Sequence, residues 1–374
     1  MIKKNIQEIS DTKQCYDCAL CGDICHTSAI SFFPDSEGFM YPQINDELCT
    51  MCTECYRKCP VNNDYETQNF LHPEVYAAWH KDENVVSKST SGGIFTAIAE
   101  YVFDNNGVVY GAKFNEDMTL NHAKAQTIEE IEKMRGSKYL QSNAEGIYKD
   151  MKLELKTGKP VLFVGLPCQT AGAKTYFKKY KNLILVDIVC HGVNSPGVFS
   201  EYTNYLEQKY NDKIKSYSFR EKKHSWMIPE VHINFEDSKT IKKSLSLDPF
   251  YAGYRKNLYI RECCYECKYT KEQRTGDITI GDFWGVPQEF YNNNGTSLVL
   301  VNSPKGQEVY QSISQNIVSH QSTFEIAKQK NPQLYKPSSI SEKNRLMREE
   351  FFARLHKGER NKLFESFIFG KPFP

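Results

Sequence analysis

The cysteines are the residues of this sequence whose number and spacing most directly indicate chemistry. Eight of the 13 cysteines lie within residues 15–59, where they form two runs with the spacing C-x2-C-x2-C-x3-C. Pro60 follows the second run, and His26 stands where proline usually follows the first. Two runs of this kind are typical of proteins that bind two [4Fe–4S] clusters, because soft thiolates suit iron–sulfur centres.

The spacing also predicts which cysteines share a cluster. Three thiolates in one tight turn bind three corners of a cubane, and the fourth points away toward the other cluster. The first cluster is therefore expected on Cys15, Cys18, Cys21 and Cys59, and the second on Cys25, Cys49, Cys52 and Cys55. Zinc or disulfides could use the same cysteines, but structural zinc sites favour paired C-x2-C knuckles at separated positions. Two iron–sulfur clusters that pass single electrons are the preferred interpretation.

Five further cysteines occur at 168, 190, 263, 264 and 267. Cys264 and Cys267 form another C-x2-C pair, while Cys168 and Cys190 each follow an expected strand. Sites collect at the carboxyl ends of strands in an α/β sheet, so these four cysteines could hold a third [4Fe–4S] cluster. Free cysteines are also often buried core residues, and the spacing leaves both interpretations open.

The elements that must position these cysteines are of two kinds. Residues 1–70 hold too few apolar side chains for a core, so the clusters would have to replace it. From residue 74, strands are expected over 75–79, 108–114, 161–164 and 183–189. Helices are expected over 143–156 and from Ile94 to a stop at Asn105-Asn106-Gly107. The predicted fold is an α+β ferredoxin-like dicluster domain followed by an α/β core with mixed sheets.

The composition argues against several classes of function. Lys and Arg total 47 and Asp and Glu total 46, so a net charge of +1 favours neither nucleic acid nor an anionic membrane as the partner. The most apolar stretch, 183–189, is too short to span a bilayer and contains Asp187. The first 11 residues lack the apolar core of a signal peptide. We therefore expect a cytoplasmic protein without membrane insertion, in which clustered cysteines serve metal or redox chemistry.

Several longer motifs between residues 74 and 285 occur in a definite order. They comprise residues 91–93, 136–142, 161–169, 187–192, 219–220 with Trp226, 264–267 and 276–285. With these motifs the chain resembles the beta-subunit family of coenzyme F420 hydrogenases and dehydrogenases. The chain after Tyr291 resembles that family more loosely.

The resemblance implies a flavoprotein whose core holds FAD and an iron–sulfur cluster and exchanges electrons with a hydride-accepting substrate. It suggests Cys168, Cys190, Cys264 and Cys267 as ligands of the third cluster, with Cys263 as a spare that could exchange with the adjoining Cys264. It also implies a division of the core into 71–157, on the flavin side, and 158–374, with the cluster. Relatives fused to a dicluster ferredoxin, the layout that this chain resembles, often accompany polysaccharide biosynthesis.

Two short segments are candidates for binding the FAD pyrophosphate, and they consist of Ser91, Gly92 and Gly93, and of Gly136, Ser137 and Lys138. Glycines let a phosphate approach the backbone, a helix N-terminus offers free N–H groups, and lysine adds a cation. Taken alone, the first segment is more often a helix cap, and a lysine in a turn such as the second is usually solvated. His191, beside Cys190, is the candidate catalytic proton donor, although a buried histidine is more often structural. Arg220, Lys222 and Trp226 could face a substrate or form a packed surface strand.

These features together predict an iron–sulfur flavoprotein oxidoreductase. Electrons would come from ferredoxin or another redox protein, pass through the clusters to FAD, and reduce a small-molecule substrate. That substrate would be coenzyme F420-like or a metabolite of a polysaccharide pathway. The alternatives are a non-catalytic electron-transfer subunit of a larger complex and a structural iron–sulfur protein without flavin.

Overall fold

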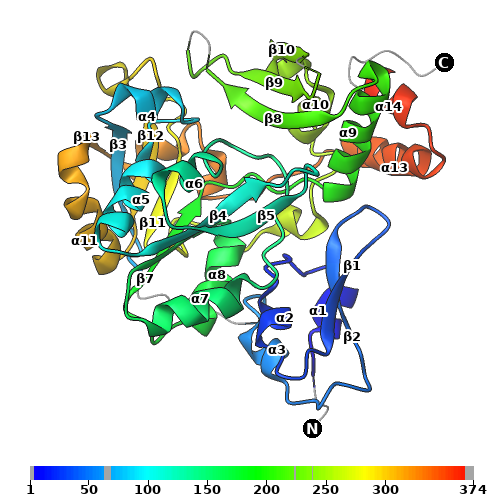
Figure 1. Cartoon of the computed structure of the whole chain (residues 1–374), viewed down its shortest axis with the longest axis horizontal. Helices are drawn as coiled ribbons and strands as arrows, with labels where there is room; N and C mark the ends of the chain where they lie inside the picture. Colours follow the sequence, from blue (N-terminus) through cyan, green and yellow to red (C-terminus); the bar gives the residue numbers. More distant parts are fainter. Residues whose placement is uncertain (1–3, 63–68, 223–224, 238, 367–374) are drawn as a thin grey trace.

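The computed structural model describes residues 4–62, 69–222, 225–237 and 239–366. A small N-terminal unit packs against a core built around one large sheet, and a second, smaller sheet lies on the other side of that core (Figure 1). Both parts of the fold prediction, the dicluster unit and the mixed α/β core, are confirmed. Among the described residues, no helix has the length and apolar character needed to cross a bilayer.

The N-terminal unit consists of three short helices and one hairpin. They are α1 (Gln7–Asp11), α2 (Leu20–Ile24), β1 (Ile30–Pro34), β2 (Met40–Ile44) and α3 (Glu54–Lys58), with β1 and β2 antiparallel. Ala19 and Thr53, which precede α2 and α3, both adopt the left-handed conformation. Each helix then ends at the last cysteine of its run in extended backbone, which turns Cys25 and Cys59 away from the preceding turn. The two runs therefore fold as equivalent units.

The large sheet has eight strands in the order β13-β3-β12-β11-β7-β6-β4-β5. The strands are β3 (Glu74–His80), β4 (Val108–Phe114), β5 (Leu120–Ala125), β6 (Val161–Gly165), β7 (Leu183–Ile188), β11 (Ile278–Asp282), β12 (Ser297–Val301) and β13 (Ile317–Ser322). The central pairs β4–β6, β6–β7 and β7–β11 are parallel, and the outer pairs are antiparallel. Segments 71–157 and 158–374, expected as separate domains, thus contribute strands to one sheet.

Helices cover both faces of this sheet, which explains why its central strands are almost wholly apolar. The helices are α4 (Glu83–Ser87), α5 (Ile94–Asp104), α6 (Ile128–Glu132), α7 (Ile147–Lys156), α8 (Pro167–Tyr176), α11 (Pro304–Ser312) and α12 (Phe324–Lys328). Leu162 packs with α5 and α11 on one face, while the next residue, Phe163, packs with α7 and α8 on the other. Successive side chains of a strand point to opposite faces, so both sets are buried.

The predicted boundaries differ from the structure mainly at turns. The helix expected over 143–156 starts only at Ile147, because Asn143 bridges to Asn121 and Gly146 adopts a φ of +83°. Helix α5 stops where expected, but Asn106 supplies the left-handed residue. Gly107 serves close packing instead, since a Cβ there would lie 2.4 Å from the Pro160 carbonyl oxygen.

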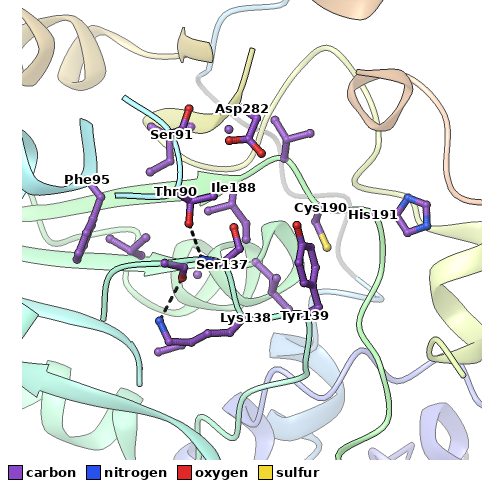
Figure 2. Close-up of a pocket in the computed structure, with 18 of the residues that line it drawn as sticks. Thr90, Ser91, Phe95, Ser137, Lys138, Tyr139, Ile188, Cys190, His191 and Asp282 are labelled. Atoms are coloured by element: carbon purple, nitrogen blue, oxygen red, sulfur yellow. Dashed lines mark hydrogen bonds between the residues drawn. The ribbon is translucent and has the colours of Figure 1, made fainter. Parts of the chain in front are cut away.

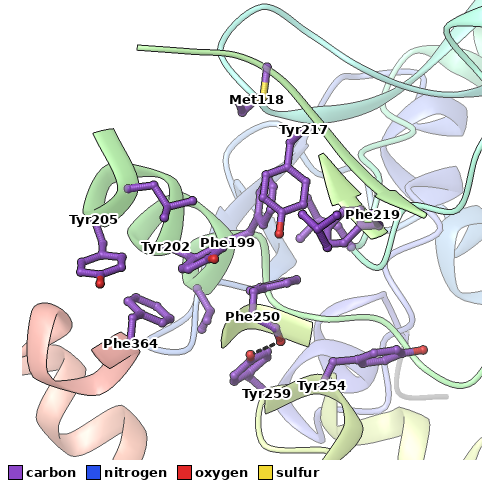
Figure 3. Packing of buried hydrophobic residues seen from close by; sticks show 14 of the residues in the cluster. Met118, Phe199, Tyr202, Tyr205, Tyr217, Phe219, Phe250, Tyr254, Tyr259 and Phe364 are labelled. Atoms are coloured by element: carbon purple, nitrogen blue, oxygen red, sulfur yellow. Dashed lines mark hydrogen bonds between the residues drawn. The ribbon is translucent and has the colours of Figure 1, made fainter. Parts of the chain in front are cut away.

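The smaller sheet has the order β10-β9-β8, formed by β8 (Ile214–Glu221), β9 (Glu230–Phe235) and β10 (Thr240–Ser244). It packs with α9 (Pro196–Tyr210), α10 (Pro249–Arg255), α13 (Glu342–His356) and α14 (Arg360–Ser366). Figure 3 shows the aromatic cluster that joins them, in which the Phe199 and Phe250 rings lie 5.0 Å apart edge to face. This cluster supports the side of the core that carries the later cysteines, since Cys264 belongs to it.

Contacts from several elements hold the N-terminal unit on the core. The Asp23 carboxylate accepts hydrogen bonds from the backbone N–H groups of Gly146 and Tyr148, both 2.8 Å long, at the start of α7. On the opposite side Glu37 of the hairpin forms an ion pair with the buried Arg348 of α13. Leu20 packs into the apolar cluster beneath α7 and α8. The unit is therefore fixed at both ends.

Candidate functional site

The first three cysteines and Cys59 meet at one place, which we call the inner cluster site. It comprises Cys15, Cys18, Cys21 and Cys59. Burial raises the pKa of the Cys21 thiol, and the neighbouring thiolates of Cys15, Cys18 and Cys59 raise it further. Burial also raises the pKa of Cys59 to about 11. Four thiols that interact in this way, three of them buried, match the crossed ligand set expected from the spacing, and iron would be needed to stabilise them as thiolates.

The other four N-terminal cysteines form the outer cluster site, made of Cys25, Cys49, Cys52 and Cys55. Burial raises the pKa of Cys55, and the Cys52 and Cys25 thiolates add to the rise. Cys25, the last cysteine of the first run, therefore lies beside the second run. Cys52 is exposed, and its Sγ lies 4.0 Å from Nδ1 of His26. The outer site is thus the one nearer to solvent.

Four of the later cysteines converge on a small cavity, the core cluster site. Its walls include Cys168, Cys190, Cys264 and Cys267, together with Tyr16, Tyr269 and Arg274. Cys168 lies in the first turn of α8, and Cys190 follows β7, whereas Cys264 and Cys267 belong to the turn at η2 (Glu262–Glu266). Burial raises the pKa of Cys168, as do the nearby Cys190, Cys267 and Cys264 thiolates. Convergence of four thiols favours a cluster over separate core thiols.

Cys263 lies outside this cavity. Its Sγ points toward the N-terminal unit, 3.4 Å from the carbonyl oxygen of Cys15. The position fits the spare role expected for it, since the four other thiols complete a ligand set without it.

The inner and core sites adjoin across helix α8. A Cβ on Gly172 would lie 3.3 Å from Sγ of Cys18, closer than an ordinary van der Waals contact, so this thiol packs tightly against the helix. Cys18 also contributes to the raised pKa of Cys168, one turn earlier on α8. The three cysteine sites therefore lie in the order outer, inner, core.

A large pocket of about 580 Å³ adjoins the core site. Cys190 lines both the small cavity of that site and this pocket. Figure 2 shows Cys190 and Tyr139 on one side of it and Ser91, Thr90 and Phe95 on another. Of the six residues expected to bind FAD phosphates, five line the pocket: Ser91, Gly93, Gly136, Ser137 and Lys138. Helix α5 starts at its wall, because Ile94 and Phe95 also line the pocket.

Gly92 is the exception among the expected phosphate residues. Its N–H donates to Oγ of Ser297 over 2.9 Å, and a Cβ would lie 2.4 Å from the Ala78 carbonyl oxygen. Gly92 therefore permits close packing of the segment on β3 and β12, and it does not line the pocket.

Hydrogen bonds join the two phosphate-binding candidates to each other. Oγ1 of Thr90 accepts from the backbone N–H of Ser137 over 2.8 Å (Figure 2). Nζ of Lys138 donates to the carbonyl oxygens of Met134 (2.9 Å), Arg135 (2.8 Å) and Gly136 (3.2 Å). Burial lowers the pKa of Lys138 to about 7. In the described part of the chain no carboxylate pairs with this lysine, so an anionic ligand would strengthen its charged form.

His191 lines both cavities, yet both of its ring nitrogens are occupied. Nε2 lies 2.7 Å from Oδ1 of Asn257, whose Nδ2 donates to the Ser339 carbonyl oxygen, so the imidazole donates here. Nδ1 accepts from Nε2 of Gln333 over 3.0 Å. Burial lowers the pKa of His191, against the hydrogen bond with Asn257. This arrangement favours a structural role over the expected proton donor.

Three matches with known families cover most of the chain. A model described as coenzyme F420 hydrogenase/dehydrogenase, beta subunit N-term, matches residues 75–148, and the model of its C terminus matches 158–325. The chain belongs to the coenzyme F420 hydrogenase/dehydrogenase beta-subunit family. A 4Fe-4S dicluster domain model matches residues 14–63 of this family member. The resemblance inferred from the motifs is therefore confirmed, as is an iron–sulfur-binding N-terminal unit.

Two relatives place this beta-subunit family member among known proteins. The coenzyme F420-dependent sulfite reductase of Methanocaldococcus jannaschii is 24% identical over 330 residues, which are 83% of this chain and 47% of that protein. The chain thus spans about half the length of that relative. A chain from the F420-reducing NiFe hydrogenase complex of Methanosarcina barkeri aligns with 79% of this chain and 90% of its own length, at a TM-score of 0.48 and 18% identity.

The residues expected to meet a substrate lie behind the pocket wall of this family member. Arg220 is buried in an ion pair with Asp282, and Trp226 stacks on Trp284 with ring centroids 4.9 Å apart. Asp282 and Trp284 themselves line the pocket, whereas Arg220 and Trp226 do not. Nζ of Lys222 donates to the carbonyl oxygen of Ser91 over 2.7 Å. These residues therefore support the wall, one layer behind the position expected from the sequence.

Proposed function

We propose that this chain is an iron–sulfur flavoprotein oxidoreductase that passes electrons from ferredoxin or another redox protein to FAD and then to an organic substrate. Its membership of the family and its dicluster domain support an F420-linked iron–sulfur oxidoreductase or electron-transfer protein. The observation that carries the finer proposal is the position of Cys190. This residue lines the cavity where four cysteines converge and also the large pocket.

The proposed ligands are the three cysteine sets already defined, one [4Fe–4S] cluster for each. Soft thiols in groups of four suit this cofactor. Exposed Cys52 makes the outer site the entry point for electrons, so residues 1–70 form the input unit. The inner site lies against α8 and thereby next to the core site.

The pocket would hold FAD with its pyrophosphate at Ser91, Gly93, Gly136, Ser137 and Lys138. The N-terminus of α5 offers backbone N–H donors, and the Lys138 ammonium, whose own N–H groups bond to backbone carbonyl oxygens, offers the positive charge that an anion requires. Bound there, the flavin would convert one-electron into two-electron chemistry. Tyr139 and Asp282 line the remaining wall, and they would orient the substrate beside it. That substrate is coenzyme F420-like or a polysaccharide-pathway metabolite.

A second candidate is a non-catalytic electron-transfer subunit. The observation that favours it is the greater length of the sulfite reductase relative, which is about twice as long as the segment that matches this chain. In this case another polypeptide would supply the catalytic part, and the present chain would relay electrons to it.

Anaerobic purification with iron, sulfide and flavin analysis tests the proposal. We expect about twelve iron atoms per chain, from three cubanes, and one FAD. An iron content near eight atoms per chain would contradict a core cluster. Protein that binds no flavin after reconstitution would refute the proposal that this chain is a flavoprotein. Reduction of oxidised coenzyme F420 or another acceptor by the isolated chain, with dithionite as the electron source, separates the enzyme from the subunit. A chain that holds its cofactors and turns over none of these acceptors would favour the subunit.

A further inference from the structure

Arg261 occupies the junction between the N-terminal unit and the core. It immediately precedes the η2 turn that carries Cys264, and its side chain is fully buried. Its backbone N–H donates to the Val193 carbonyl oxygen over 2.9 Å, and its own carbonyl oxygen accepts from the N–H of Cys264, also over 2.9 Å. The backbone of Arg261 thus supports a ligand of the core cluster site.

The side chain of the same residue crosses to the inner cluster site. Nε donates to the carbonyl oxygen of Cys15 over 2.6 Å, and Nη2 donates to that of Met40 over 2.9 Å. Nη1 donates to Oε1 of Gln141 over 3.2 Å, and the guanidinium carbon lies 4.2 Å from the centre of the Tyr41 ring. Three directional hydrogen bonds and an aromatic face therefore fix the cation between two sets of thiols.

The charge of this guanidinium is only partly offset. Its ion-pair partner in the described part of the chain is Asp17, whose Oδ2 lies 3.9 Å from Nη1. The other arginine buried at this junction, Arg348, has a direct carboxylate partner in Glu37. A buried cation held at a distance from its counter-charge acts strongly on other groups nearby, because little water screens it.

Arg261 contacts one ligand residue of each site. Its Nε donates to the backbone carbonyl oxygen of Cys15, and its own carbonyl oxygen accepts from the N–H of Cys264. Because the arginine is fully buried, little water separates its charge from either site. The same cation therefore lies beside a ligand of the inner site and a ligand of the core site.

We propose that Arg261 is a positioning residue that raises the reduction potentials of the inner and core clusters together, so that single electrons cross between the two units. The inference rests on the proposed function for the presence of the clusters. A cubane bound by four thiolates is negative, so an added electron is disfavoured in a water-poor interior and a fixed cation offsets this cost. Each transfer oxidises one cluster by one electron and reduces its neighbour by one, and no bond is made or broken.

The effect should differ among the three sites. At the inner site Arg261 contacts the backbone of Cys15, whereas the cavity of the core site is also lined by a second arginine, Arg274. The side-chain hydrogen bonds of Arg261 reach Cys15, Met40 and Gln141, and no cysteine of the outer site. We expect the largest change at the inner cluster, a smaller one at the core cluster and none at the outer cluster.

The test is an anaerobic redox titration of the full chain at pH 8, followed by electron paramagnetic resonance. In Arg261→Gln, the ratio of reduced to oxidised inner cluster at a fixed potential should fall about tenfold, which is ~59 mV for one electron. Asp17→Asn removes the nearest negative charge and should raise that ratio, with the opposite sign. Arg345→Gln is the matched control, because Arg345 pairs with Glu262 at the surface and should change the ratio less than twofold.

Signals are assigned by comparison with Cys264→Ser and Cys52→Ser proteins. Equal shifts at all three clusters would show general loosening and overturn the inference, as would a fully iron-loaded Arg261→Gln protein with an unchanged inner cluster. If Arg261→Gln does not retain iron, Asp17→Asn decides, and no upward shift refutes the electrostatic role. Wild-type protein without iron would instead refute the proposed function itself.

Discussion

The affinity for FAD should depend on pH through Lys138, and this dependence can be worked out from the pocket. Burial lowers the pKa of Lys138 to about 7 in the free protein. The ammonium form has three N–H donors, which match the three carbonyl oxygens around Nζ. A pyrophosphate beside it requires this charged form, and its own negative charge would return the pKa toward the usual value near ~10.4.

The direction and the size of the pH effect on FAD affinity follow from this difference in the pKa of Lys138 between the free and the bound protein. Below pH 7 the lysine is already charged and affinity is at its highest. Above pH 7 binding must also protonate the lysine, so each further pH unit weakens it by up to about tenfold, or ~1.4 kcal/mol. Half of the lysine is charged at pH 7 and about one part in 100 at pH 9, so the Kd should rise about 50-fold between these values.

Flavin fluorescence titrations of FAD-depleted protein between pH 6 and pH 9 measure this effect. Lys138→Met should bind about tenfold or more weakly at pH 6, because a buried positive charge beside the pyrophosphate is lost, and should lose the dependence on pH. Lys133→Met is the control, because Lys133 is exposed at the end of the neighbouring α6. A wild-type Kd constant within threefold from pH 7 to pH 9, or a Lys138→Met protein that keeps the full dependence, would refute a phosphate site at Lys138.

Three other predictions concern the cysteine sites, the packing of helix α8, and His191. Cys264→Ser should lose about four iron atoms and keep the N-terminal clusters, whereas Cys52→Ser should lose iron from the outer cluster. Iron analysis with electron paramagnetic resonance checks both variants. Equal iron losses from every site would contradict separate ligand sets. Gly172→Val should destabilise the protein by about 1–3 kcal/mol in urea unfolding, because a Cβ already lies 3.3 Å from Sγ of Cys18, and an unchanged midpoint would argue against this packing. His191→Asn should alter the pH profile of turnover little, because both ring nitrogens of His191 already form hydrogen bonds. Loss of one limb of that profile would instead support His191 as the proton donor.

The sequence predicted those features that are imposed locally. The cubane demands a particular spacing, so the cysteine runs indicated the crossed sets of inner and outer sites before any geometry was known. Strands β4, β6 and β7 were found because burial on both faces makes them continuous apolar runs. Helix α5 and its stop followed from periodicity and from an asparagine-glycine turn.

Features that depend on distant partners could not be predicted in this way. Gly92 looked like a phosphate-binding glycine, but its requirement comes from β3 and from Ser297, 205 positions away. The hydrogen bonds of His191 come from Asn257 and Gln333, 66 and 142 positions further on. Arg261 gave no signal at all, because its main partners are backbone carbonyl groups 246 and 221 positions away, and a carbonyl group has no sequence signature.

Under the proposed function, the docking of the N-terminal unit by Asp23 and Glu37 restricts which dicluster modules this core could accept. A module without these carboxylates would neither cap α7 nor pair with Arg348. Grafting a different module onto this core would therefore require transplanting both acidic residues along with the metal ligands. The exposed Cys52 takes part in neither contact, so a change of external electron donor at this surface would leave the docking intact.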